Sequence, residues 1–143
     1  MKHIKAQRGR RERGSALLLT LLLTLVGAMF LGLAVDAMSL VWVRSNAQTT
    51  ANLVAAAVAM EQQRNPAANP DYLLETARAT AALNGFTHGE EAVAVQLERA
   101  EGKFGVLLEK DAGVYFLRAI RPQPVTVRAR AGVEMAAPVK AGL

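Results

Sequence analysis

The apolar run from Ala16 to Val35, 20 residues without a charge, restricts the possible folds of this sequence more than any other feature. A helix rises about 1.5 Å per residue, so this run would be about 30 Å long, the hydrocarbon thickness of a bilayer. Nine of its residues are leucine, and each leucine favours insertion by about 0.3–0.6 kcal/mol near the helix centre. We therefore expect a transmembrane span at about residues 16–36.

The residues before this run are strongly basic. Residues 1–14 carry a net charge of +5, equal to the formal net charge of the whole chain, so the remaining residues are neutral overall. Basic residues beside a membrane helix favour the cytoplasmic side. We interpret 1–14 as a cytoplasmic leader and expect the chain after Arg44 to be exported. A nucleic-acid partner is not expected, because it would need basic side chains clustered on the folded part.

Three residues after the apolar run are candidates for the membrane boundary or for contacts between subunits: Asp36, Trp42 and Arg44. We expect Trp42 to anchor the helix at the interface and Arg44 to mark its polar limit. An ionisable group such as Asp36 is costly at this depth and is usually paired. Arg44 lies about 12 Å further along the helix, too far to be that partner. We expect Asp36 either to be solvated at the interface or to pair with another chain or a lipid head group.

Removal of the leader is an alternative that changes the whole interpretation. The sequence "AVDA" at Ala34–Ala37 weakly resembles a signal-peptidase site, although the apolar core of a signal peptide normally has about 7–15 residues. Cleavage there would leave a secreted soluble binding module. Gly14 and Ser15 form another possible peptidase boundary, of the kind that a prepilin peptidase cuts; otherwise Gly14 simply marks the start of the helix.

The helix is expected to continue beyond the membrane, over residues 15–64 in all. No Pro or Gly occurs from Ser45 to Arg64, and Asn65-Pro66 ends the helix because proline disfavours helical geometry in the preceding residue. The expected buried face consists of Ala47, Ala51, Val54, Ala55 and Val58. Within the apolar run, Gly27, Ala28 and Gly32 form a patch of small residues. Such a patch either packs against another helix or reflects ordinary membrane-helix composition.

The exported part, residues 65–134, predicts an α+β domain. Asn69–Gly85 has the capping residues of a second helix, and period-two patterns follow in "AVAVQLE", "KFGVLLEK" and "PVTVRARAGVE". We expect about three antiparallel strands, a hairpin turn at Glu101-Gly102, a short helix within 113–120 and a loose tail at 135–143. Because so short a segment buries little surface alone, the upper half of the long helix should complete the core.

Residues that could support catalysis or bind a metal are sparse. The chain has no Cys, and its two histidines, His3 and His88, are far apart. Glu90-Glu91 fits a solvated turn, and Arg128 and Arg130 fit a charged strand edge better than an anion site. We therefore expect no enzyme activity, metal, cofactor or small-molecule substrate.

The sequence from Arg13 to Ala59, "RGSALLLTLLLTLVGAMFLGLAVDAMSLVWVRSNAQTTANLVAAAVA", resembles the N-terminal region of TadE/TadG-like Flp (tight adherence) pilus assembly proteins. The matching features are Arg13-Gly14, Ala34-Val35-Asp36, Arg44, Gln48 and the alanine-rich run 51–57. "AALNG" and "VTVRARAGVE" extend the resemblance to about residue 134. Asn52 stands where the family usually has Asp. Leu19 stands where pilins proper carry a Glu, counted from Ser15 as the first mature residue.

This resemblance implies a pilin-like plan in a bacterial inner-membrane protein, with the N-terminus in the cytoplasm and the C-terminal domain in the periplasm or outside the cell. The implied function is that of a minor or pilin-like subunit in Tad/Flp pilus assembly. Its partners would be membrane lipid and other pilus subunits, contacted through the long helix. The alternative within the same architecture is a type II secretion pseudopilin or a minor type IV pilin.

Overall fold

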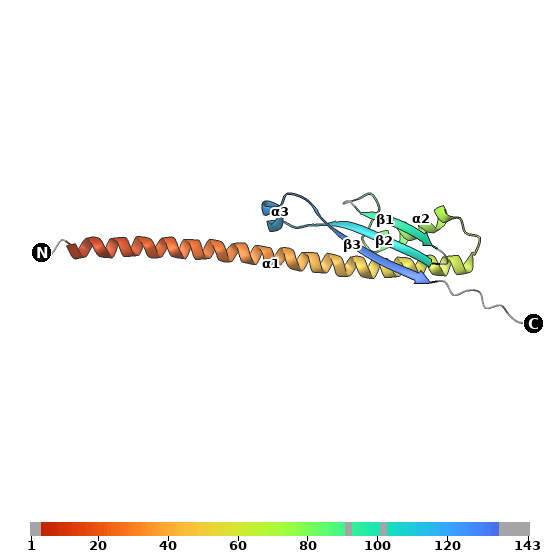
Figure 1. Ribbon diagram of the computed structural model, residues 1–143, viewed down its shortest axis with the longest axis horizontal. Coiled ribbons are helices and arrows are strands. Elements are labelled where there is room, and N and C mark those ends of the chain that lie inside the picture. Colours follow the sequence, from red (N-terminus) through yellow and green to blue (C-terminus); the bar gives the residue numbers. More distant parts are fainter. Residues whose placement is uncertain (1–3, 91–92, 101–102, 135–143) are drawn as a thin grey trace, which may run out of the picture.

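The computed structural model describes residues 4–90, 93–100 and 103–134 and has the predicted α+β architecture (Figure 1). The expected turn at Glu101-Gly102 and the expected loose tail at 135–143 lie outside these residues. In chain order the elements are α1 (Ile4–Arg64), α2 (Pro70–Leu83), β1 (Ala94–Ala100), β2 (Lys103–Ala112), α3 (Phe116–Ile120) and β3 (Val125–Glu134). The short helix expected within 113–120 is therefore present as α3.

Helix α1 has 61 residues and is about 90 Å long at 1.5 Å per residue. Its end at Arg64 agrees with the prediction from Asn65-Pro66. Its start at Ile4 does not agree with the expectation that Gly14 marks the beginning of the helix. One glycine inside a helix costs only about 1 kcal/mol, so the basic residues before Gly14 simply extend α1.

The two threonines of the apolar run satisfy their hydroxyl groups within the helix. Thr20 donates to the carbonyl oxygen of Ala16 at 2.9 Å, and Thr24 donates to that of Thr20 at 2.8 Å. Each hydroxyl therefore has a partner within the helix, which removes the cost of an unsatisfied polar group in apolar surroundings. Among the residues that the structure describes, α1 is the one helix that is long and apolar enough to span a membrane.

Helix α2 begins and ends at the residues that its sequence predicts. The side chain of Asn69 accepts a hydrogen bond from the backbone N–H of Asp71, and Pro70 occupies the first turn, where its missing N–H costs nothing. After Asn84 the chain turns at Gly85, whose φ of +81° is easily reached only without a Cβ. Leu73, Ala77 and Ala81 are buried as expected, whereas Leu74 is half-buried.

The three strands form one antiparallel sheet in the order β1-β2-β3. Strand β3 alternates as its sequence predicts, because Val127 and Ala129 are buried while Arg128 and Arg130 are exposed. Its register places Arg128 opposite Glu109 of β2, and their side chains form an ion pair of 2.5 Å. Such an exposed pair contributes at most about 1 kcal/mol, so burial of the inner face is what holds the sheet in place.

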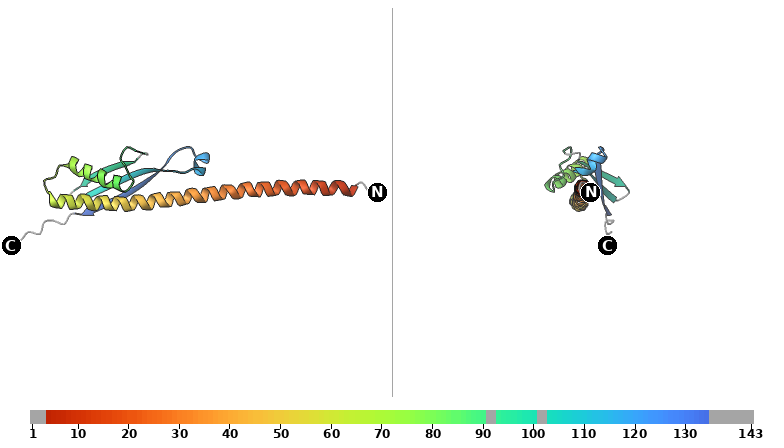
Figure 2. Two further views of the ribbon diagram at one scale, coloured as in Figure 1. Left: turned by 180° about the vertical axis from the view of Figure 1, so that it is seen from behind. Right: turned by 90° about the vertical axis from the view of Figure 1, so that its left-hand side faces the viewer.

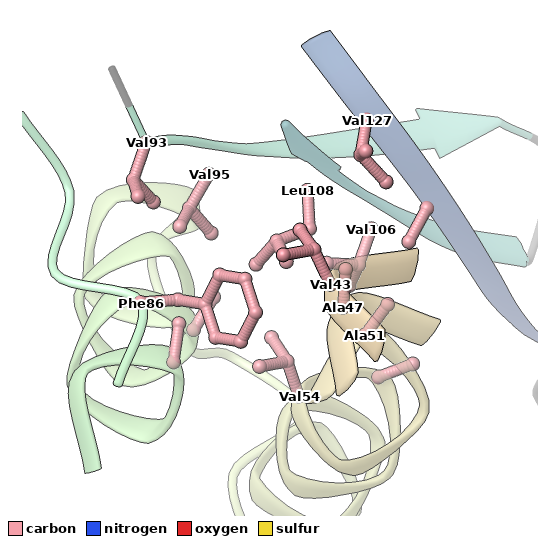
Figure 3. Packing of buried hydrophobic residues seen from close by; sticks show 14 of the residues in the cluster. Val43, Ala47, Ala51, Val54, Phe86, Val93, Val95, Val106, Leu108 and Val127 are labelled. Atoms are coloured by element: carbon pink, nitrogen blue, oxygen red, sulfur yellow. The ribbon is translucent and has the colours of Figure 1, made fainter. Parts of the chain in front are cut away.

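The core forms between the sheet, α2 and the C-terminal half of α1 (Figure 3). All five residues of the face predicted for α1, from Ala47 to Val58, are essentially inaccessible to solvent. Phe86 fills the space between α2 and α1, close to Val54 and Val95 in Figure 3. Alanine at positions 47, 51 and 55 brings the axis of α1 close to the sheet, so the long helix is part of the domain rather than only its anchor.

The whole C-terminal domain lies on one side of α1, as the end-on view in Figure 2 shows. The other half of the helix, which contains the apolar run, extends away from the domain (Figure 1). Its leucines from Leu17 to Leu25 are exposed. The molecule is therefore a long rod whose apolar half is bare and whose other half carries a small folded domain.

Candidate functional site at the junction of the long helix and the domain

The connection between β2 and β3 brings α3 back along the long helix. In Figure 1, α3 lies at the end of the domain nearest the N-terminus, beside the middle of α1. Within α1, the residues Gly32, Asp36 and Ser39 contact this connection between β2 and β3. Two of these were candidate site residues from the sequence, and the structure places them in one contact with a segment about 80 residues away.

Asp36 is the centre of this junction. Its Oδ1 accepts a hydrogen bond from the backbone N–H of Tyr115 at 2.9 Å, and its Oδ2 accepts one from that of Leu117 at 2.5 Å. Only 2% of the residue is exposed. The expectation that Asp36 is solvated, or pairs with another chain or a lipid head group, is therefore wrong. Its partners are two amide groups of its own chain.

The reason lies in the unsatisfied donors at the start of every helix. The first N–H groups of a helix have no partner within it, and a negative charge there also interacts favourably with the helix dipole. Tyr115, the residue that caps α3, provides no side-chain hydrogen bond. Asp36 supplies the missing acceptor from α1. The carboxylate of Asp36 thus gains two hydrogen-bond donors at the end of the apolar run. In return, α3 gains the acceptor that its own N-terminal residue does not provide.

Gly32 makes the close approach possible. A Cβ on Gly32 would lie closer than 3.0 Å to three atoms of the Phe116 ring, so the ring covers a position that only glycine leaves open. From the sequence, the small residues Gly27, Ala28 and Gly32 either pack against another helix or reflect ordinary membrane-helix composition. In the structure Gly32 is covered by Phe116 of the same chain, which corrects that prediction at this position. Gly27 and Ala28 are exposed, and no atom lies within 4 Å of a Cβ built on Gly27.

A third contact completes the junction. The hydroxyl of Ser39 donates to the carbonyl oxygen of Gly113 at 3.2 Å. Gly32, Asp36 and Ser39 are spaced by four and three residues, which places them on one face of a helix. A glycine, a carboxylate and a hydroxyl at this spacing in an apolar helix are a sequence signal for a docked segment, although the signal does not identify that segment.

The other candidate boundary residues, Trp42 and Arg44, are not part of the junction, and both are exposed. Arg44 lines a hollow of about 460 Å³ together with Thr126 and Arg128 of β3. One turn further, the side-chain amide of Gln48 donates to the carbonyl oxygen of Arg130 at 2.8 Å. Gln48 thus fastens α1 to the edge strand β3, a role that its sequence context did not indicate.

Gly14 and Ser15 lie within α1 and are exposed. The helix is continuous through these two residues. The possible peptidase boundary therefore lies on an exposed part of α1, between the basic residues and the apolar run.

The polar residues of the domain serve structural contacts in the described part of the chain. His88 accepts a hydrogen bond at Nδ1 from the backbone N–H of Val95, at 3.1 Å, and so fixes the approach to β1. Asp111 accepts a hydrogen bond from the hydroxyl of Thr126 at 2.7 Å. Within residues 4–90, 93–100 and 103–134, no three His, Cys, Asp or Glu residues lie together in a way that could hold a metal ion.

The chain matches no protein-family model, no curated protein and no solved structure. Its function is therefore inferred from the bare half of α1, the domain packed on the other half and the junction between them.

Proposed function

We propose that this protein is a non-enzymatic, single-pass membrane component of Tad/Flp-type pilus assembly, as a minor or pilin-like subunit. The observation that carries the proposal is the division of α1 into a bare apolar half and a half built into a small α+β domain. That division suits a subunit that is held in the bilayer and presents a folded domain on one side of it. The resemblance of residues 13 to 134 to this class of pilus proteins supports the same role.

A stripe along α1 supports packing against other helices. At about 100° per residue, one side of the helix lies opposite the face that is buried under the domain. The exposed apolar residues on that side are Val35, Met38, Trp42, Leu53 and Met60. This stripe, interrupted by the exposed Ser45 and Thr49, extends from the apolar run into the domain half of the helix, where no lipid would cover Leu53 and Met60. We propose that sister subunits cover it in the assembled state.

The junction supports an uncut apolar run. Cleavage at Ala34–Ala37 would separate Gly32 from Ser39 and remove or isolate the carboxylate that caps α3. The backbone N–H groups of Tyr115 and Leu117 would then lose their acceptor, and α3 would lose the hydrogen bonds that hold it on α1. A retained span is thus favoured over a secreted soluble module.

The basic leader supports an orientation with the N-terminus in the cytoplasm and the domain on the periplasmic or outer side of the inner membrane. Leu19 supports a minor rather than a bulk subunit, because this position offers no carboxylate to a neighbouring subunit's N-terminal amine. A type II secretion pseudopilin or minor type IV pilin is the alternative role. Mass spectrometry separates them, because an N-terminus at a methylated Ser15 would favour the alternative.

Cross-linking through single cysteines tests the proposed assembly, because the chain has none of its own. Leu53→Cys and Met60→Cys are expected to give cross-linked dimers in membranes of cells that assemble the pilus. Leu83→Cys is a matched control, since Leu83 is exposed at the end of α2, away from the stripe. Equal cross-linking at all three sites, or none at the stripe, would contradict packing through α1. Loss of pili when the gene is deleted tests the pilus assignment itself.

A further inference from the structure

We propose that α3 and the residue before it form a foot that inserts into the lipid head-group layer on the domain side of the membrane. The foot consists of residues 115–120, held on α1 by Asp36 and Gly32. This inference rests on the membrane span of the proposed function, but not on a role in a pilus. It gives the protein a second contact with the membrane, separate from the apolar run.

The first argument is the height of the foot along α1. Phe116 covers Gly32, which lies within the uncharged run that ends at Val35. Gly32 is about 6 Å below Asp36 along the helix axis at 1.5 Å per residue. A bilayer that surrounds the run as far as Val35 must therefore meet the Phe116 ring, because the ring occupies one side of α1 at that height.

The second argument is the exposed surface of the foot. Tyr115, Phe116 and Ile120 are 79%, 49% and 63% exposed, although all three are large and apolar. Only Leu117 of this segment turns toward the core, where it is half-buried. Exposed aromatic and aliphatic side chains beside the end of a membrane span fit the boundary between head groups and acyl chains.

The third argument is charge. Arg118 lies within the foot and Arg121 follows it, and both are exposed. Arg121 Nε donates to Oε1 of Gln123 at 3.2 Å, which leaves the rest of its guanidinium toward solvent. Arginine side chains can lay their stems along apolar surface and hold the charge at the level of lipid phosphates. The combination of aromatic, aliphatic and cationic side chains is that of an interfacial segment.

The junction gives the foot a defined position. Two hydrogen bonds to Asp36 and one from Ser39 fix the backbone from Gly113 to Leu117 on α1. Strands β2 and β3 lead directly into this connection. The foot is therefore held at a fixed height on α1, beside the end of the apolar run.

The depth of a nitroxide label on a single cysteine tests the proposal. The full chain is placed in nanodiscs of phosphatidylethanolamine and phosphatidylglycerol at one chain per disc, with a label at Ile120→Cys. We expect collisions with oxygen to dominate over collisions with a water-soluble nickel chelate at this site. Leu83→Cys, which is also exposed but distant from the membrane, should show the opposite preference. Adding Asp36→Ala to Ile120→Cys should shift the label toward the aqueous pattern.

A label at Leu22→Cys keeps the two proposals separable. If this site reads as hydrocarbon while Ile120→Cys is as accessible to nickel as Leu83→Cys, the span stands and the foot is wrong. If Leu22→Cys is also aqueous, the membrane span falls and takes the foot with it. Protection of Ile120→Cys that appears only with several chains per disc would mean that a second copy covers α3, which overturns the lipid proposal.

Discussion

The aromatic ring of Phe116 lies directly against Gly32, although the two residues are more than 80 positions apart in the sequence. This contact joins the apolar half of α1 to the domain built on its other half. Together with the hydrogen bonds to Asp36, it makes the end of the apolar run part of the tertiary structure.

Gly32→Ala is expected to displace α3 while leaving the main core folded. The added methyl group would overlap the Phe116 ring, so the ring and the segment that carries it must move. Amide hydrogen exchange at Tyr115 and Leu117 should become faster. Gly27→Ala is the matched control, since a Cβ there meets no atom within 4 Å, and its exchange at these amides should equal that of the parent chain. Unchanged exchange in both variants would mean that α3 does not depend on Gly32.

Asp36→Ala should have a larger effect on the same amides, because it removes the acceptor of both hydrogen bonds. A hydrogen bond to a charged group contributes about 1.5–3 kcal/mol, so exchange should accelerate roughly ten- to hundred-fold. Asp36→Asn keeps one oxygen acceptor, so its exchange rates at Tyr115 and Leu117 should lie between those of the parent chain and of Asp36→Ala. If Asn and Ala variants both exchange at the parent rate, the carboxylate does not cap α3.

Ala55→Leu and Ala56→Leu should differ although they are neighbours on α1. Ala55 is 1% exposed and faces the core, whereas Ala56 is exposed on the other side of the helix. Overpacking at position 55 is expected to lower the free energy of unfolding by about 1–3 kcal/mol, and position 56 should change it little. Thermal unfolding of the two purified variants measures this, and equal losses would argue against the observed helix rotation.

Titration of Tyr72 reports the contact between α2 and the end of α1. The hydroxyl of Tyr72 donates to Oε1 of Glu61 at 3.1 Å. This bond and the negative charge of Glu61 raise the pKa of Tyr72 above its ordinary value of 10.0. The protonated phenol is thus favoured in the fold, and its contribution is present below that ordinary pKa and is lost as the pH rises through the higher folded pKa. In a Tyr115→Phe background, tyrosinate absorbance should show a high midpoint that Glu61→Gln lowers. Equal midpoints would contradict this contact.

Much of the fold is predictable because it depends on residues close in sequence. The buried face from Ala47 to Val58 follows from helical spacing, and the ends of α2 follow from Asn69, Pro70 and Gly85. Alternation in β3 likewise predicts which side chains are buried. In each case the residues that carry the sequence pattern belong to one helix or strand. The pattern therefore predicts the ends of that element and its buried face without any long-range contact.

The junction is not predictable in this way. Asp36 and Leu117 meet only because two ten-residue strands carry their connection back along α1. The nearest basic residue along the helix is Arg44, too far away to pair with Asp36, so the sequence alone indicates interfacial solvation or a partner outside the chain. Backbone N–H groups at the start of a helix can stabilise a carboxylate as effectively as a basic side chain can. The position of these N–H groups is set by long-range packing. The local signals on the same face of α1 were the small size of Gly32 and the hydroxyl of Ser39.

The proposed topology, in which the apolar run crosses a membrane and separates the basic leader from the folded domain, can be tested by labelling single-cysteine variants. A membrane-impermeant maleimide is added to intact spheroplasts. We expect Leu83→Cys to be labelled from outside, whereas Arg10→Cys should be labelled only after the membrane is permeabilised. Labelling of both sites without permeabilisation, or recovery of the intact chain in the soluble fraction, would contradict it.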